Sequence, residues 1–157
     1  MTAATELAVE LIALVRDNED KANFADGCSP EMLEAAEQRL GVAFPPSYRR
    51  VIEEFGTWEI AGVEFLGVYQ TPAMGEELLG SVHATVEGWS RGLPESLVVV
   101  MFDDMVGLVS VDMGRTNPEG EAPVVAWTPD GRAEELGSDF GSYALHVCQN
   151  AVQGWQR

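Results

Sequence analysis

The chain has 157 residues, of which 26 are Asp or Glu and nine are Lys or Arg, so its formal net charge is -17 at pH 7. A chain of this length folds as one domain and buries about 70% of the surface that it exposes when unfolded. A strongly negative surface excludes nucleic acid and anionic membrane as favoured partners, because both are polyanions. It favours a basic protein partner, whose association it would accelerate; the alternative is that the acids serve only solubility.

Three features indicate a soluble, cytoplasmic protein. The only cysteines, Cys28 and Cys148, lack the paired spacing of a metal or redox motif, so free thiols in a reducing compartment are expected. At the N-terminus, Glu6 and Glu10 interrupt the apolar residues and no basic leader precedes them. No apolar stretch approaches the length that spans a membrane.

The first part of the chain has the apolar spacing of helices. Apolar residues recur every three or four positions over 4–17 and predict an amphipathic helix, which a polar break over 18–26 follows. Ser-Pro-Glu at 29–31 is typical of a helix start, with a hydroxyl at the N-cap and proline at the first helical position. The glutamates at positions 31, 34 and 37 indicate a solvated face of this second helix, and Gly41 ends it.

Two adjacent prolines, Pro45 and Pro46, predict a rigid corner before a third helix. The residue before a proline is pushed out of the helical region, so Phe44 is expected to be extended. Pro46 suits the first helical position, where its missing N–H would have no partner. The helix that follows carries an apolar face over 48–55.

Beyond residue 56 the apolar period changes to that of strands. Residues 58–68 alternate around Ala61-Gly62, which predicts a hairpin or a bulged strand. The later elements are a helix over 78–89, strands over 97–102, 108–111 and 124–127, and a closing helix over 138–152. This order predicts an α+β fold: an antiparallel or mixed sheet of about five to six strands, helices at the N-terminus, one inserted helix and one closing helix.

No residue pattern supports catalysis, a cofactor or a metal. Neither histidine has further ligands at metal spacing, and His146 and Cys148 point in different directions on a helix. Asp103, Asp104 and Asp112 fit turns and strand ends better than a calcium loop. An unrecognised hydrolase stays open as an alternative, and it would need these three aspartates around a metal or in a cleft.

Three stretches resemble the SUKH superfamily. Residues 37–52, EQRLGVAFPPSYRRVI, resemble its opening motif of Glu-x-x-Leu-Gly, a spacer, an apolar residue with proline, a polar pair, Tyr and an apolar helix. Residues 97–112 resemble its apolar strand, acidic turn and strand ending in Asp. Residues 123–127 with 138–140 resemble its last strand and closing helix. One departure is Pro46-Ser47, which stands where an acid is common.

The resemblance covers about residues 29–150. It implies a single SUKH-like domain over 1–157, with 1–27 as an N-terminal helical addition. The superfamily includes bacterial immunity proteins of polymorphic toxin systems and the yeast cell-wall assembly regulator. It therefore implies binding rather than catalysis.

The expected function is that of a cytoplasmic immunity protein, which binds a cognate toxin domain and occludes its active site. The acidic charge independently favours a basic partner such as a nuclease toxin. A non-catalytic regulatory protein-interaction module of the same fold is the alternative, and the oligomeric state is open. Trp58 would be an anchor only if exposed, and a core position is favoured for it. The candidate partner-binding residues lie on the predicted hairpin, the acidic turn and the polar loop: Trp58, Glu59, Glu64, Asp103, Asp104, Glu119 and Glu121.

Overall fold

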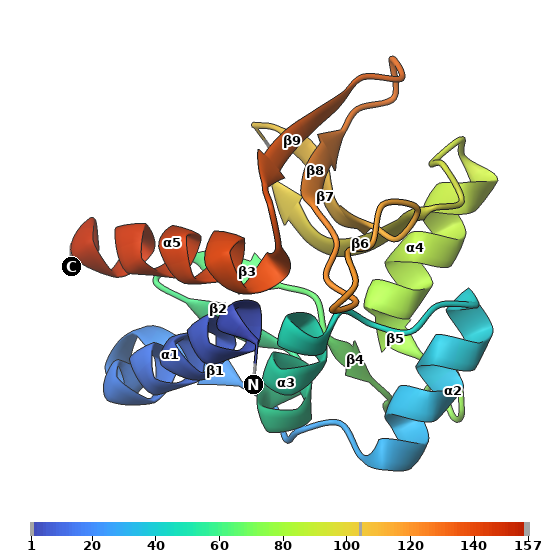
Figure 1. Ribbon diagram of the computed structural model, residues 1–157. Helices are drawn as coiled ribbons and strands as arrows, with labels where there is room; N and C mark the ends of the chain where they lie inside the picture. The colour runs from blue at the N-terminus through green and yellow to red at the C-terminus, as the bar shows by residue number, and fades with distance from the viewer. Residues whose placement is uncertain (1, 104, 156–157) are drawn as a thin grey trace.

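The protein is described by a computed structural model over residues 2–103 and 105–155 (Figure 1). The α-helices in these ranges are α1 (Ala3–Asp17), α2 (Pro30–Leu40), α3 (Pro46–Phe55), α4 (Ser81–Ser90) and α5 (Phe140–Gln153). The strands are β1 (Ala22–Phe24), β2 (Trp58–Ile60), β3 (Val63–Phe65), β4 (Val68–Tyr69), β5 (Leu79–Gly80), β6 (Leu97–Asp103), β7 (Gly107–Asp112), β8 (Val124–Trp127) and β9 (Ala133–Gly137). A 3₁₀ helix, Glu19–Lys21, joins α1 to β1. None of the described helices is both long and apolar enough to cross a membrane.

Seven strands form one antiparallel sheet in the order β1-β2-β3-β6-β7-β8-β9, and β4 pairs with β5 in a separate small sheet. The predicted α+β class is confirmed, but the predicted count of five to six strands is too low. Strand β1 lies inside the segment that was expected to be a polar break. Strand β9, with the sequence AEELG, has three exposed residues followed by two partly buried ones. Neither has the apolar alternation by which a strand is recognised in sequence.

Helices α1, α3 and α5 cover one face of the sheet; Figure 1 shows α1 and α5 in front of β2 and β3. The core beneath them is aromatic. Trp58 stacks on Phe65 with ring centroids 4.8 Å apart, and Tyr48 meets Phe140 edge to face at 5.0 Å. Only 2% of Trp58 is exposed, so this side chain belongs to the core and does not anchor a partner.

Local capping determines where the helices begin and end. α2 starts as predicted, because Ser29 Oγ accepts a hydrogen bond from the backbone N–H of Met32 at 3.1 Å. Gly41 ends α2 in the left-handed conformation, with φ of 73°. α4 begins at Ser81, three residues after the predicted start, because β5 precedes it and Gly80 has φ of 76°.

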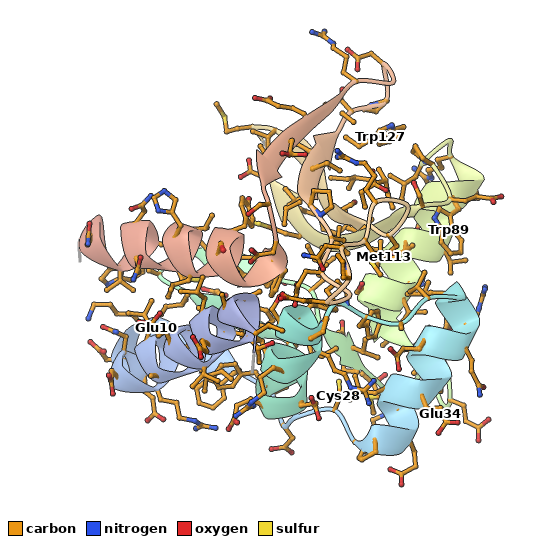
Figure 2. The ribbon with its side chains drawn as sticks, in the orientation of Figure 1. Glu10, Cys28, Glu34, Trp89, Met113 and Trp127 are labelled. Carbon is orange, nitrogen blue, oxygen red and sulfur yellow. The ribbon has the colours of Figure 1, made fainter. Side chains whose placement is uncertain are left out.

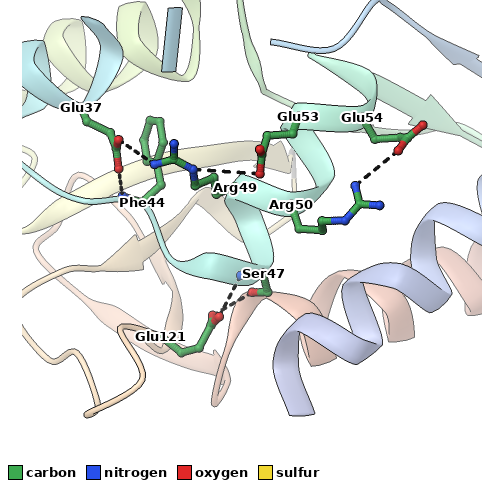
Figure 3. Close-up of polar contacts among 8 residues, drawn as sticks. All are labelled: Glu37, Phe44, Ser47, Arg49, Arg50, Glu53, Glu54 and Glu121. Atoms are coloured by element: carbon green, nitrogen blue, oxygen red, sulfur yellow. Dashed lines mark hydrogen bonds and ion pairs between the residues drawn. The ribbon is translucent and has the colours of Figure 1, made fainter. Parts of the chain in front are cut away.

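Glu37 bridges the proline corner between α2 and α3 (Figure 3). Its Oε2 accepts a hydrogen bond from the N–H of Phe44 at 2.7 Å, and its Oε1 pairs with Nη1 of Arg49 at 2.9 Å. Pro46 begins α3, as predicted. Glu37 is therefore not simply a solvated acid of α2, because its carboxylate joins the two helices on either side of the corner.

Candidate protein-binding surface

The sheet has a second face, opposite α1, α3 and α5, which we call the open face, although α4 covers part of it. Side chains alternate along a strand, so the neighbours of a core residue point to the open face. Phe65 and Met101 are core residues paired across β3 and β6, and the next step of this antiparallel register brings Glu64 opposite Phe102. One row of the open face thus crosses all seven strands: Asn23, Glu59, Glu64, Phe102, Leu108, Trp127 and Ala133.

The acidic end of this row is the pair Glu59 and Glu64. The β2–β3 turn has φ of 49° at Ala61 and 86° at Gly62, as in two-residue type I′ hairpins, and the predicted hairpin is confirmed. The turn places Glu59 directly opposite Glu64. Like charges in this position destabilise a sheet. Neither carboxylate forms an ion pair within the residues that the structure describes, so no cation among those residues relieves the repulsion between them.

The centre of the row is apolar and forms part of a groove. Phe102, near the end of β6, exposes 57% of its surface, and Leu108 lies opposite it on β7, partly buried. These two residues, with Leu66 and Tyr69, line a groove of about 460 Å³ that α4 borders on its other side. An exposed aromatic ring beside a mostly apolar groove is typical of a surface that binds an apolar side chain.

α4 is fixed against the half of β6 that lacks a strand neighbour on the β3 side. Ser81 Oγ donates to the carbonyl of Val99, and Thr85 Oγ1 accepts from the N–H of the same residue at 2.8 Å. One turn further, Nε1 of Trp89 donates to the carbonyl of Leu97 at 3.2 Å. These bonds satisfy backbone groups that a strand would otherwise satisfy, and they fix the α4 side of the groove.

The same helix packs on an apolar cluster deeper than the groove. Trp127 on β8 belongs to this cluster and Trp89 on α4 packs against it; Figure 2 shows the two tryptophans on their elements. Leu66 and Leu108 contact the cluster from the groove side. The groove therefore has a packed floor.

Three titratable side chains follow the rim of the groove along α4: His83, Glu87 and Arg91, spaced four residues apart. Glu87 lies 3.2 Å from Nε2 of His83 and 3.0 Å from Nη2 of Arg91. His83 also has Glu77 at 3.6 Å from its Nδ1. Among the described residues that line the groove, each basic side chain therefore faces a carboxylate.

Three other acids predicted to bind a partner, Asp103, Glu119 and Glu121, do not belong to this row. Asp103 Oδ1 accepts hydrogen bonds from the N–H groups of Met105 and Val106, at 2.8 and 3.2 Å, so this carboxylate stabilises the β6–β7 turn. Asp104 lies outside the described residues. Glu119 is exposed in the loop between β7 and β8. Of the predicted acids, the structure brings Glu59 and Glu64 together.

Glu121 is buried, so it is a structural residue rather than the exposed binding residue that the sequence suggested. Ser47 donates two hydrogen bonds to its carboxylate, from N–H at 2.8 Å and from Oγ at 2.7 Å (Figure 3). Ser47 Oγ in turn accepts from the N–H of Gly141 at 3.0 Å. Burial raises the pKa of Glu121, and the hydrogen bonds from Ser47 oppose this rise. The network joins the β7–β8 loop to the first turns of α3 and α5.

The groups considered for catalysis are separated or unreactive. Burial raises the pKa of Cys28 to about 11 and that of Cys148 to about 12, so both thiols are protonated at neutral pH and are poor nucleophiles. Asp103 and Asp112 lie at opposite ends of the β6–β7 pair, about 17 Å apart along β7 at roughly 3.4 Å per residue. They do not share the cleft that the hydrolase alternative needs. Within the described ranges, no group of three His, Cys, Asp or Glu side chains is placed to hold a metal ion.

The elements are those of a small α+β domain in which helices joined by a proline corner precede an antiparallel sheet and a last helix closes the core. The family model SUKH_5, described as SMI1-KNR4 cell-wall, matches residues 8–149. The chain therefore belongs to the SUKH superfamily, as its motifs predicted. The match begins within α1, earlier than the motifs do, and α1 contributes Leu11 and Val15 to the core.

Proposed function

We propose that this chain is an immunity protein, which binds a cognate polymorphic toxin domain in the cytoplasm and occludes its active site. The observation that carries the proposal is the match to the SUKH_5 family over residues 8–149. The acidic surplus of the chain indicates the charge of the partner, because a net charge of -17 favours a basic protein. A nuclease toxin is basic where it binds its polyanionic substrate, so we propose a nuclease as the target.

The distribution of the positive charges supports a basic partner further. Almost every Lys and Arg in the described ranges is already paired with an acid of this chain, which leaves the surplus of acids for a partner. Those paired residues are Arg16, Lys21, Arg49, Arg50, Arg91, Arg115 and Arg132. Exposed pairs of this kind contribute at most about 1 kcal/mol each to stability. Their main consequence is that the described part of the surface has few free cations to repel a basic protein.

The test is capture followed by rescue. The tagged full-length chain is used to capture proteins from its native cytoplasm at low salt, where electrostatic attraction is least screened. Each captured protein is then expressed in cells with and without the chain. We expect a basic domain that kills cells lacking the chain and is harmless in its presence. Repeated captures that return no toxic protein would refute the immunity function.

A regulatory protein-interaction module is the second candidate, and the SMI1-KNR4 cell-wall description of the matching model favours it. Such a module would bind several partners with moderate affinity, and none of them would be toxic. The same captures separate the two functions. One toxic partner with rescue supports the immunity protein, whereas several non-toxic partners support the regulatory module.

A further inference from the structure

We infer that the partner docks on the open face of the sheet, where an apolar side chain enters the groove beside Phe102 and basic side chains contact Glu59 and Glu64. This inference rests on the proposed function and assigns it a surface. The occupant is a basic protein domain that presents an apolar residue flanked by Lys or Arg.

Phe102 forms the apolar half of this surface. It exposes 57% of its surface although it ends a run of buried strand residues. Leu108 lies opposite it, and the groove of about 460 Å³ opens beside the pair. An aromatic ring at the edge of a preformed apolar groove supplies contact area without ordering a flexible side chain, which is how interface hot spots are built.

The carboxylate pair forms the other half of this surface, and it favours a positively charged group on the partner. Glu59 and Glu64 oppose each other across β2 and β3, and neither forms an ion pair within the described part of the chain. A cation placed between them would gain attraction from both groups and relieve their repulsion. Because Glu64 is one strand from Phe102 in the register of the sheet, one partner segment can contact both halves of the surface.

Charge also selects against a second copy of this chain as the occupant. A second copy would also carry a net charge of -17, and it would place its own Glu59 and Glu64 against this pair or against the apolar groove. Like charges opposed across an interface disfavour the wrong partner.

The groove is also held in shape before binding. Tyr48 donates a hydrogen bond to the carbonyl of Leu66 at 2.6 Å on one side, and α4 is bonded to β6 on the other.

The test uses two variants of the open face and two matched controls, each as the full-length chain. Phe102→Ser removes the apolar anchor, and the double variant Glu59→Gln with Glu64→Gln removes the two charges. The control for the anchor is Met74→Ser, which changes an apolar residue that is 48% exposed and does not line the groove. The control for the charges is the double variant Glu10→Gln with Glu34→Gln, two exposed acids on α1 and α2 (Figure 2).

The dissociation constant of the captured toxin and rescue from it are measured for every variant. We expect Phe102→Ser to raise the dissociation constant by about 30-fold or more, the effect of losing a hot-spot residue. The Glu59→Gln and Glu64→Gln pair is expected to raise it about tenfold, mainly by slowing association, while each control stays within about twofold. The same pair of changes should raise the urea midpoint of the free chain, because it removes a repulsion.

The outcomes separate this inference from the function on which it rests. If the toxin binds and both open-face variants bind as the unaltered chain does, the docking surface is refuted and the immunity function stands. Loss of binding in the Glu10 and Glu34 control alone would likewise refute the open face. If the unaltered chain captures no toxin, the immunity function fails and the docking inference fails with it. If Phe102→Ser also lowers the urea midpoint, the Glu59→Gln and Glu64→Gln variant decides: weakened binding supports the open face, and unchanged binding refutes it.

Discussion

A carboxylate inside the protein accounts for a departure from the SUKH motif. The superfamily commonly has an acid where this chain has Pro46-Ser47, at the N-terminus of α3. Here Glu121 reaches the same helix end from the β7–β8 loop and accepts two hydrogen bonds from Ser47. A negative group at this end is favourable, because it meets free N–H groups and the positive end of the helix dipole. The same local chemistry is thus supplied by a residue 74 positions away in the sequence.

Replacing Glu121 with Gln tests this role. The amide NH₂ of Gln would face one of the two donors of Ser47, so one buried hydrogen bond is lost and about 1 to 3 kcal/mol of unfolding free energy with it. The measurement is urea unfolding at pH 7. Replacing exposed Glu119 with Gln is the control, and a change within about 0.5 kcal/mol is expected there. A Glu121→Gln variant as stable as the unaltered chain would contradict the structural role.

The raised pKa of Glu121 adds a dependence on pH. When a carboxyl has a higher pKa folded than unfolded, the folded state holds the proton more tightly in the window between the two values. Stability from this group therefore falls as pH rises through that window, which lies above the usual value of 4.5. We expect the stability difference between the unaltered chain and Glu121→Gln to grow as the pH is lowered from 7 toward 4.5. A difference that shrinks on acidification would contradict the raised pKa.

At the scale of elements, the helices were predictable and the sheet edges were not. α1, α2 and α3 repeat apolar residues over ten or more positions, and Ser29 and Pro46 mark two of their starts. β1 has three residues, and it is a strand because Asn23 pairs with Glu59, a contact between distant segments.

The exposure of Phe102 was not predicted either, because it also depends on pairing between strands. In sequence Phe102 ends an apolar run that predicts a buried strand, and only the pairing of strands shows that its side chain lies on the open face, where 57% of it is exposed.

The proline corner depends on Glu37 as well as on the prolines. Its carboxylate accepts a hydrogen bond from Phe44 and pairs with Arg49, so it fixes the angle between α2 and α3. We expect Glu37→Ala to lower the unfolding free energy by about 2 kcal/mol, since both bonds involve a charged acceptor. Glu37→Gln keeps an acceptor for Phe44 and should lose less. Equal losses in the two variants would show that the hydrogen bond to Phe44 contributes nothing.

The attachment of α4 to β6 gives a second prediction for an element. Thr85→Val keeps the shape of the side chain and removes the acceptor for the buried N–H of Val99, which should cost about 1 to 3 kcal/mol. Faster hydrogen exchange at the Val99 amide is the specific readout. Thr116→Val, at an exposed position without this contact, is the control and should leave both measurements unchanged. Unaltered exchange at Val99 in Thr85→Val would contradict the attachment.

For the whole molecule, the composition gives the charge and the structure gives its distribution. The sequence could show that acids outnumber Lys and Arg by 26 to nine, and it correctly placed Glu59 and Glu64 on one hairpin. It could not show that Glu121 is buried, or that Asp103 is engaged by its own turn, because both depend on hydrogen bonds within the fold. Among the described residues, most cations are paired with acids, whereas Glu59 and Glu64 form no ion pair and lie directly opposite each other.

Salt should therefore act with opposite signs on the free protein and on its complex. Between about 0.01 M and about 1 M NaCl the Debye length falls from roughly 30 Å to roughly 3 Å. In the free protein, added salt screens the repulsion among the charges that make up the net charge of -17, and this repulsion destabilises the compact state. Added salt also weakens the exposed ion pairs, which contribute at most about 1 kcal/mol each. Because acids exceed cations so strongly, we expect relief of repulsion to dominate and the urea midpoint to rise with salt. The dissociation constant for a basic partner should rise over the same range, since its attraction is screened as well. The Glu59→Gln, Glu64→Gln variant has two negative charges fewer, so its urea midpoint should rise less with salt than that of the unaltered chain. A urea midpoint that falls with salt would mean that the ion pairs outweigh the repulsion.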